Sequence, residues 1–260
     1  MDKKTVSALA QNMRNAELNR KAVGALTAAY PDLSIADAYM VQRAAVEERI
    51  RSGGTVIGKK VGLTSNAMQL ALGVSEPDFG HLFADMLFDE EIPVPVSRFL
   101  QPRIEAEIAF VLGEDMKGPG VSIADVLRTT VSVVPSFEII DSRIADWKIK
   151  IQDTIADNGS SAGFVLGSKL VPIGSVDLKY VGLVLQKNGS IIETAAGAAV
   201  MGHPARAVAW LANALAGMDV GLKRGEIVLS GSFTKAFDVA AGDVFTASFG
   251  GLGSVKVVFV

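Results

Sequence analysis

Three glutamates in two apolar, strand-like segments are the residues of this chain whose types and spacing suit joint chemistry. Glu105 and Glu107 lie in residues 102–112, and Glu138 lies in residues 131–140. A β-strand sends residues i and i+2 to the same face, so Glu105 and Glu107 point in one direction. Two close carboxylates repel each other, and burial would raise their pKa unless a cation compensates for their charge. Oxygen-only ligands suit a hard divalent cation, which indicates Mg²⁺ or Mn²⁺ rather than zinc. The alternative interpretation is an edge strand with a solvated acidic face.

A lysine and an aspartate are two further candidates. Lys60 lies in the apolar segment 56–63 next to Lys59, and adjacent strand residues face opposite ways. One of the two therefore points inward, where it would hold an anion or transfer a proton, unless the strand lies at an edge and both ammonium groups reach water. Asp78 lies in a turn-rich segment, residues 76–81, that we expect to be a loop. Its two interpretations are a catalytic base and an ordinary turn residue.

The secondary structure that must position these residues is predicted to change near residue 54, from helices to mostly strands. The first fifty residues are predicted to be helical: residues 6–29 are rich in alanine with scattered charges, and Ser34 precedes a segment with helical spacing that ends before Gly53. Residues 56–63 indicate a strand and residues 65–72 a short helix, and most of the remainder indicates short strands. That remainder includes a hairpin around Asn188, one helix over 204–215, and strands over 226–230, 244–249 and 254–260. We therefore predict an α+β fold with a helical N-terminal region (residues 1–54) and a β-rich catalytic domain (residues 55–260).

The composition excludes several classes of function. Hydrophobic residues make up 49% of the 260 residues and charged residues 20%, so a sizeable core is expected and disorder is not. The formal charge of -3 and the lack of any basic run argue against a nucleic-acid binder. There is no cysteine and there are two histidines, which excludes disulfides, thiolate chemistry and a His-rich zinc site. No apolar run reaches the length of a membrane span, and the N-terminus has no signal-like apolar segment. We expect a cytoplasmic, soluble protein that acts on a small molecule.

Six motifs follow one another along the chain, at residues 58–65, 76–80, 102–110, 137–143, 146–153 and 156–161. Together they resemble one known family, the 2-oxopent-4-enoate (2-hydroxypenta-2,4-dienoate) hydratases of aromatic meta-cleavage pathways. These hydratases belong to the fumarylacetoacetate hydrolase superfamily, and the resemblance extends over nearly the whole chain. It implies the mixed β roll typical of the C-terminal domain of that superfamily.

The resemblance also implies roles for individual residues. The metal-binding carboxylates of the family match Glu105, Glu107 and Glu138, and its site lysine and loop aspartate match Lys60 and Asp78. The two serines that lie near the substrate carboxylate in the family match Ser160 and Ser161. They follow Gly159, where an alanine is usual, and we expect a more flexible loop for that reason. The resemblance leaves three residues without a role, namely His81, Arg143 and Lys235.

The implied reaction is the hydration of 2-hydroxypenta-2,4-dienoate to 4-hydroxy-2-oxopentanoate with Mg²⁺ or Mn²⁺ and without an organic cofactor. The family also implies a homo-oligomer, either a pentamer or a decamer, and possible association with pathway enzymes. The related 4-oxalocrotonate decarboxylases, which lack Asp78 and the motif at residues 146–150, are the nearest alternative. Acylpyruvate hydrolases would need a His-Glu arrangement that the sequence does not show. A non-catalytic subunit is a third alternative, and the intact acidic triad argues against it.

Overall fold

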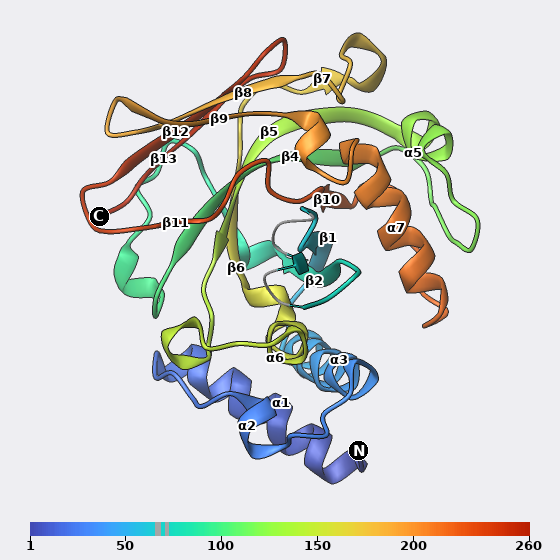
Figure 1. Cartoon of the computed structure of the whole chain (residues 1–260), viewed down its shortest axis with the longest axis vertical. Coiled ribbons are helices and arrows are strands. Elements are labelled where there is room, and N and C mark those ends of the chain that lie inside the picture. The colour runs from blue at the N-terminus through green and yellow to red at the C-terminus, as the bar shows by residue number, and fades with distance from the viewer. Residues whose placement is uncertain (66–68, 71–72) are drawn as a thin grey trace.

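The N-terminal part of the molecule is helical. The structure, a computed structural model, describes residues 1–65, 69–70 and 73–260. Helices α1 (Lys3–Asn19), α2 (Leu26–Ala29) and α3 (Ile35–Arg51) lie together below the β-rich body in Figure 1. Ser34 caps α3 by accepting a hydrogen bond from the backbone N–H of Asp37, as the sequence predicts. The helical segment predicted over 6–29 is wrong in its extent, because α1 ends at Asn19 and Val23 forms a β-bridge with Ile144.

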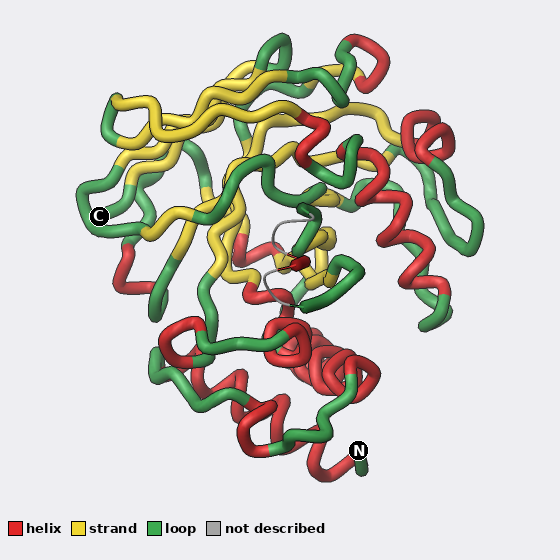
Figure 2. Tube along the Cα trace, viewed as in Figure 1, coloured by secondary structure: helices red, strands yellow, loops and turns green. Residues whose placement is uncertain are grey.

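Two sheets make up the body, as Figure 2 shows in yellow. The larger has the strand order β2-β1-β10-β4-β5-β6-β3, with β11 paired to β4 and β7 paired to β5, and the smaller has the order β13-β12-β8-β9. The strands of the larger sheet are β1 (Val56–Gly62), β2 (Asp78–Phe83), β3 (Leu87–Phe88), β4 (Arg103–Leu112), β5 (Thr130–Ile140), β6 (Ser161–Leu166), β7 (Val171–Pro172), β10 (Ile227–Leu229) and β11 (Phe237–Asp238). The strands of the smaller sheet are β8 (Gly182–Lys187), β9 (Ser190–Ala196), β12 (Val244–Phe249) and β13 (Gly253–Val258).

Three helices of the body are α5 (Ile123–Thr129), α6 (Ile151–Ala156) and α7 (Pro204–Ala216). The sequence predicts α7 and the hairpin of β8 and β9, and the structure confirms both. It does not predict α5 and α6, which are corrections to an expectation of strands there. The helix predicted over 65–72 falls largely on residues outside the described part. The α+β fold, with its helical N-terminal part and β-rich body, is confirmed.

The two faces of the large sheet have different surroundings. One face packs against α7 and the smaller sheet, in a core that includes Ile108, Phe110 and Val208. The other face carries a smaller apolar cluster that includes Ala109 and Leu229. Because strand residues alternate, Glu107 lies on the same face as Ala109, one step further along β4. The candidate site is therefore on the face away from α7. In the described residues, no helix is long and apolar enough to cross a membrane.

Candidate metal centre and active site

The three glutamates converge because β4 and β5 are antiparallel neighbours. Glu105 on β4 lies directly opposite Glu138 on β5, and Glu107 lies opposite Ser136. Directly opposed residues of an antiparallel pair share a face, so all three carboxylates point to one place. One oxygen from each lies within 4.8 Å of the others. Glu107 and Glu138 are completely buried, and Glu105 is partly buried.

The electrostatics of this cluster favour a cation. Burial and the charge of Glu138 raise the pKa of Glu105 to about 7 and raise that of Glu107 well above its usual value. Burial also raises the pKa of Glu138, although Lys60 opposes this shift. Glu107 Oε1 and both oxygens of Glu138 have no hydrogen-bond partner of normal geometry among the described residues. Buried oxygens that lack partners and repel one another fit a hard divalent cation, which would supply the missing charge and contacts.

Lys60 faces this cluster and Lys59 faces away from it. The Lys60 ammonium lies 3.5 Å from Glu138 Oε2, whereas Lys59 pairs with Glu226 at 2.8 Å. Both lysines are buried, so the edge-strand interpretation with two solvated ammonium groups does not hold. Burial lowers the pKa of Lys60, but the four carboxylates around it, of which Glu138 acts most strongly, raise it above its usual value. The surrounding carboxylates therefore favour the protonated form of Lys60, which is suited to stabilise negative charge or to donate a proton.

Asp78 is the first residue of β2 and lies opposite Gly62 of β1. The loop predicted for residues 76–81 is wrong from Asp78 onward, because this segment pairs with β1. Asp78 is 1% exposed, and the Thr154 hydroxyl donates a hydrogen bond of 3.3 Å to its Oδ2. Burial raises its pKa, although Lys60 opposes the shift. A Cβ atom on Gly62 would lie 2.2 Å from Asp78 Oδ1, so only glycine leaves room for this carboxylate.

Ser160 ends the short 3-10 turn Asn158–Ser160, and Ser161 begins β6. Both serines are buried, and their hydroxyls lack a hydrogen-bond partner of normal geometry among the described residues. Ser161 lies beside Glu138 and, like Lys60, opposes the upward shift of the Glu138 pKa that burial causes. The turn that leads into β6 has three consecutive residues in the left-handed conformation, namely Asn158 (φ 56), Gly159 (φ 62) and Ser160 (φ 55). A Cβ atom on Gly159 would lie 2.9 Å from Lys60 Cε, so this turn packs directly on the lysine stem.

That left-handed turn is held on both sides. The Asn158 side chain exchanges two hydrogen bonds with the backbone of His81, of 2.8 and 2.9 Å. Asp157 forms a buried ion pair with Arg143, whose guanidinium also donates to the Ser161 carbonyl. Arg143 therefore has a structural role, because it holds the backbone on either side of the turn that carries the two serines. Burial lowers the pKa of His81 to about 4, and Lys235 lies over the Phe237 ring at 5.3 Å.

The sequence did not point to three other contacts of the site. These are the backbone N–H of Gly231, which donates to Glu107 Oε2 at 2.8 Å, the hydroxyl of Thr154, and Ser136 beside Glu107. Each comes from a segment far from its partner in sequence. Single serine, threonine and glycine residues form no distinctive sequence pattern, so these three contacts are evident only from the three-dimensional structure.

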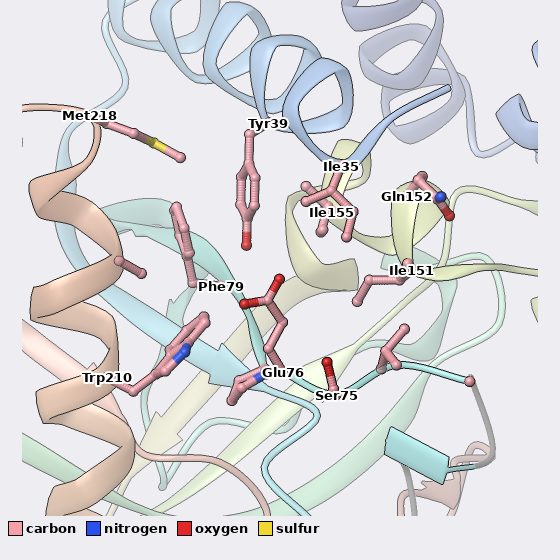
Figure 3. Close-up of a pocket in the computed structure, with 14 residues that line it drawn as sticks. Ile35, Tyr39, Ser75, Glu76, Phe79, Ile151, Gln152, Ile155, Trp210 and Met218 are labelled. Atoms are coloured by element: carbon pink, nitrogen blue, oxygen red, sulfur yellow. The ribbon is translucent and has the colours of Figure 1, made fainter. Parts of the chain in front are cut away.

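A cavity of about 560 Å³ adjoins the segment that carries Asp78. Glu76, Pro77 and Phe79, which flank Asp78 in the chain, line it together with Tyr39 of α3 and Trp210 of α7. Tyr39 stacks on Phe79 with ring centroids 4.6 Å apart, and Figure 3 shows its hydroxyl directed toward the Glu76 carboxylate. Apolar and polar groups both line the cavity, and its aromatic residues pack next to Asp78 through Phe79.

Comparison with known proteins shows the family to which the chain belongs. Residues 55–260 match the model of the fumarylacetoacetate (FAA) hydrolase C-terminal family. The chain is 42% identical to the 2-oxo-hept-4-ene-1,7-dioate hydratase of Escherichia coli, over 100% of this chain and 99% of that protein. It is 48% identical to a 2-hydroxypent-2,4-dienoate hydratase of Pseudomonas putida, over 83% of this chain and 97% of that protein.

Solved structures with a similar fold come from the same group of proteins. The 4-oxalocrotonate decarboxylase from Pseudomonas putida G7, complexed with magnesium and adipate, superposes with a TM-score of 0.98 at 38% identity, covering 100% of this chain and 99% of that one. The fumarylpyruvate hydrolase from Pseudomonas aeruginosa, in complex with Mn²⁺ and pyruvate, has a TM-score of 0.64 at 16% identity over 78% of this chain and 88% of that one, which shows a shared fold alone. From the family match and these identities, the chain belongs to the fumarylacetoacetate hydrolase family.

Proposed function

We propose that the protein is a metal-dependent hydratase that converts 2-hydroxypenta-2,4-dienoate (2-oxopent-4-enoate) to 4-hydroxy-2-oxopentanoate. One observation carries the proposal: three converging carboxylates lie beside a protonated lysine and a buried aspartate. The relatives named hydratases, at 38 to 48% identity, support this reaction. We also propose that the protein works as a homo-oligomer.

Glu105, Glu107 and Glu138 would hold the cation, and Mg²⁺ and Mn²⁺ suit their oxygen atoms best. Solved relatives hold magnesium, calcium or manganese, which supports a divalent ion. When bound, such a cation chelates the carboxylate and keto oxygens of a 2-oxo acid and draws electrons from the carbonyl group.

The remaining residues divide the other tasks. Lys60 carries a positive charge where negative charge develops on the substrate as the dienol is converted to the conjugated ketone. Asp78 has a raised pKa and one oxygen without a partner, so it is suited to take up or return a proton or to orient the incoming water. The hydroxyls of Ser160 and Ser161 are free to donate hydrogen bonds to the substrate carboxylate.

Decarboxylation of 4-oxalocrotonate is the second candidate, because the solved decarboxylase shares the whole fold. An absorbance assay separates the two. The protein is given 2-hydroxypenta-2,4-dienoate or 4-oxalocrotonate, each with Mg²⁺, with Mn²⁺ or with a chelator. We expect loss of the conjugated dienol and formation of the hydroxyketone without carbon dioxide, and only with metal. Release of carbon dioxide from 4-oxalocrotonate without hydration of the dienoate would overturn the proposal, and turnover of neither substrate would favour a non-catalytic subunit.

A further inference from the structure

Ser136 completes a square of side chains of which the other three are the glutamates. On β4, Glu105 and Glu107 are two residues apart, and on β5, Ser136 and Glu138 are two residues apart. The register pairs Glu105 with Glu138 and Glu107 with Ser136. All four side chains therefore share one face of the sheet, and Ser136 occupies the corner next to Glu107.

The Ser136 hydroxyl is buried and has no partner. Its exposed fraction is 0%, and among the described residues nothing donates to or accepts from its Oγ. One oxygen of Glu107 is also without a partner. Oε2 accepts a hydrogen bond from the Gly231 N–H, but Oε1 has no partner among the described residues. A buried polar atom without a partner destabilises the fold, so two such atoms at neighbouring positions of paired strands point to a shared ligand.

We propose that Ser136 is a positioning residue of the metal centre, whose hydroxyl holds a water molecule against Glu107 and thereby orients that carboxylate toward the cation. The Ser136 hydroxyl and the Glu107 carboxylate form no direct hydrogen bond, and a water molecule can bridge two polar groups that do not bond directly. Hydroxyl groups both donate and accept, so Ser136 serves a water that also contacts a carboxylate. This inference rests on the proposed function in one respect, that a metal binds to the three glutamates. It does not depend on which reaction the protein catalyses.

The test compares two buried serines. Ser136→Ala removes the hydroxyl beside Glu107. Ser230→Ala is the matched control, because Ser230 is also 0% exposed and unpartnered among the described residues. Its N–H bonds to the Ile108 carbonyl, which places it level with Ile108, on the face away from Glu107. Isothermal titration with Mn²⁺ alone measures the affinity, and a thermal melt with chelator checks the fold.

Removing an outer partner of a metal ligand typically weakens affinity by about 10–100-fold. We expect Ser136→Ala to weaken Mn²⁺ binding at least tenfold while its melting temperature with chelator stays equal to or above wild type. Ser230→Ala should bind Mn²⁺ like wild type. Unchanged affinity in Ser136→Ala, or equal losses in both variants, would overturn the inference. A wild-type protein that binds Mn²⁺ but hydrates no dienoate would instead refute the proposed function and leave the role of Ser136 standing.

Discussion

At the scale of single residues, the neighbouring lysines separate catalysis from stability. Lys60 faces the carboxylates and Lys59 pairs with Glu226 on the other face. We predict that Lys60→Ala still binds metal but loses about a hundredfold or more in kcat, the usual cost of removing a positioned proton-transfer group. Lys59→Ala should keep its kcat but melt at a lower temperature, since Glu226 loses its ion pair. Steady-state kinetics and thermal melts of both variants check this. Equal losses of kcat would show that Lys60 has no special role.

Asp78 tests how the proton and the water are handled. Asp78→Asn keeps the size of the side chain and an oxygen that accepts from Thr154, but it loses the ionisable group. We predict a strong fall in hydration with melting temperature and metal affinity close to wild type. Dienol ketonisation and water addition are measured separately by absorbance. Ketonisation that persists while water addition stops would place Asp78 at the water, whereas wild-type rates of both steps would leave it a packing residue.

The residues of the site could be predicted from sequence only in part. The spacing of Glu105 and Glu107 places both on one face of a strand, and the consecutive lysines require one inward side chain. Ser136 and the Gly231 N–H cannot be predicted in this way, because Ser136 lies next to Glu107 through strand pairing and Gly231 bonds to it across 124 positions of the sequence. Asp78 was expected in a turn, since a Pro-Asp pair is typical of turns and its pairing with β1 is a tertiary contact.

At the scale of elements, one side chain of α3 joins the two segments that carry Asp78 and Thr154. Gln42 is 1% exposed, and its amide donates to the carbonyl oxygens of Phe79 on β2 and Ile155 on α6, at 2.8 Å each. The position of Asp78 relative to the site therefore depends on α3, which belongs to the helical N-terminal part.

We predict that Gln42→Leu, which keeps the bulk but removes both donors, lowers the free energy of unfolding by about 1–3 kcal/mol. Because β2 and α6 are then less firmly joined, kcat should also fall. Chemical denaturation and steady-state kinetics measure the two effects. The control is Gln11→Leu, since Gln11 is exposed on α1. If Gln42→Leu matched that control in both measurements, the amide would not be holding these elements together.

The sequence predicts the longer helices and misses the two short ones, although α5 begins with a capping box of the same kind as α3. Helix α3 has a capping box and α7 has Pro204 in its first turn, and both were predicted. Helices α5 and α6 have seven and six residues, too few for a clear helical period. Asp153 of α6 is buried against Thr27, a contact that spans 126 residues and leaves no local pattern.

At the scale of the whole molecule, the site joins parts that sequence could not place relative to one another. The β-rich body supplies the carboxylates and Lys60, and the N-terminal helices hold α6 and β2 through Thr27 and Gln42. The composition and the change of period near residue 54 predict both parts. How they pack depends on buried polar contacts between residues 37 to 126 positions apart in the sequence.

The raised pKa values of the three glutamates make the stability of the whole molecule depend on pH and metal. A carboxyl whose pKa is higher in the folded than in the unfolded state binds protons more tightly when folded. Its contribution to stability is present below the unfolded pKa, near 4.5, and is lost as pH rises through the folded pKa, about 7 for Glu105. Glu107 and Glu138 shift in the same direction. The metal-free protein should therefore lose stability between about pH 5 and pH 8.

A divalent cation should reverse this loss, because it binds the ionised carboxylates of the folded state. When the concentration of free cation is a hundred times its Kd, binding stabilises the folded state by about 2.7 kcal/mol. We predict that the difference in melting temperature between protein with Mg²⁺ and protein with chelator grows as pH rises from 5 to 8. Glu107→Gln is the control, because it removes one charge from the cluster. With chelator at pH 8 it should melt above wild type, with a smaller dependence on pH, and Mg²⁺ should stabilise it little. A metal-induced shift that is independent of pH, or equal in both proteins, would mean that these carboxylates do not hold the cation.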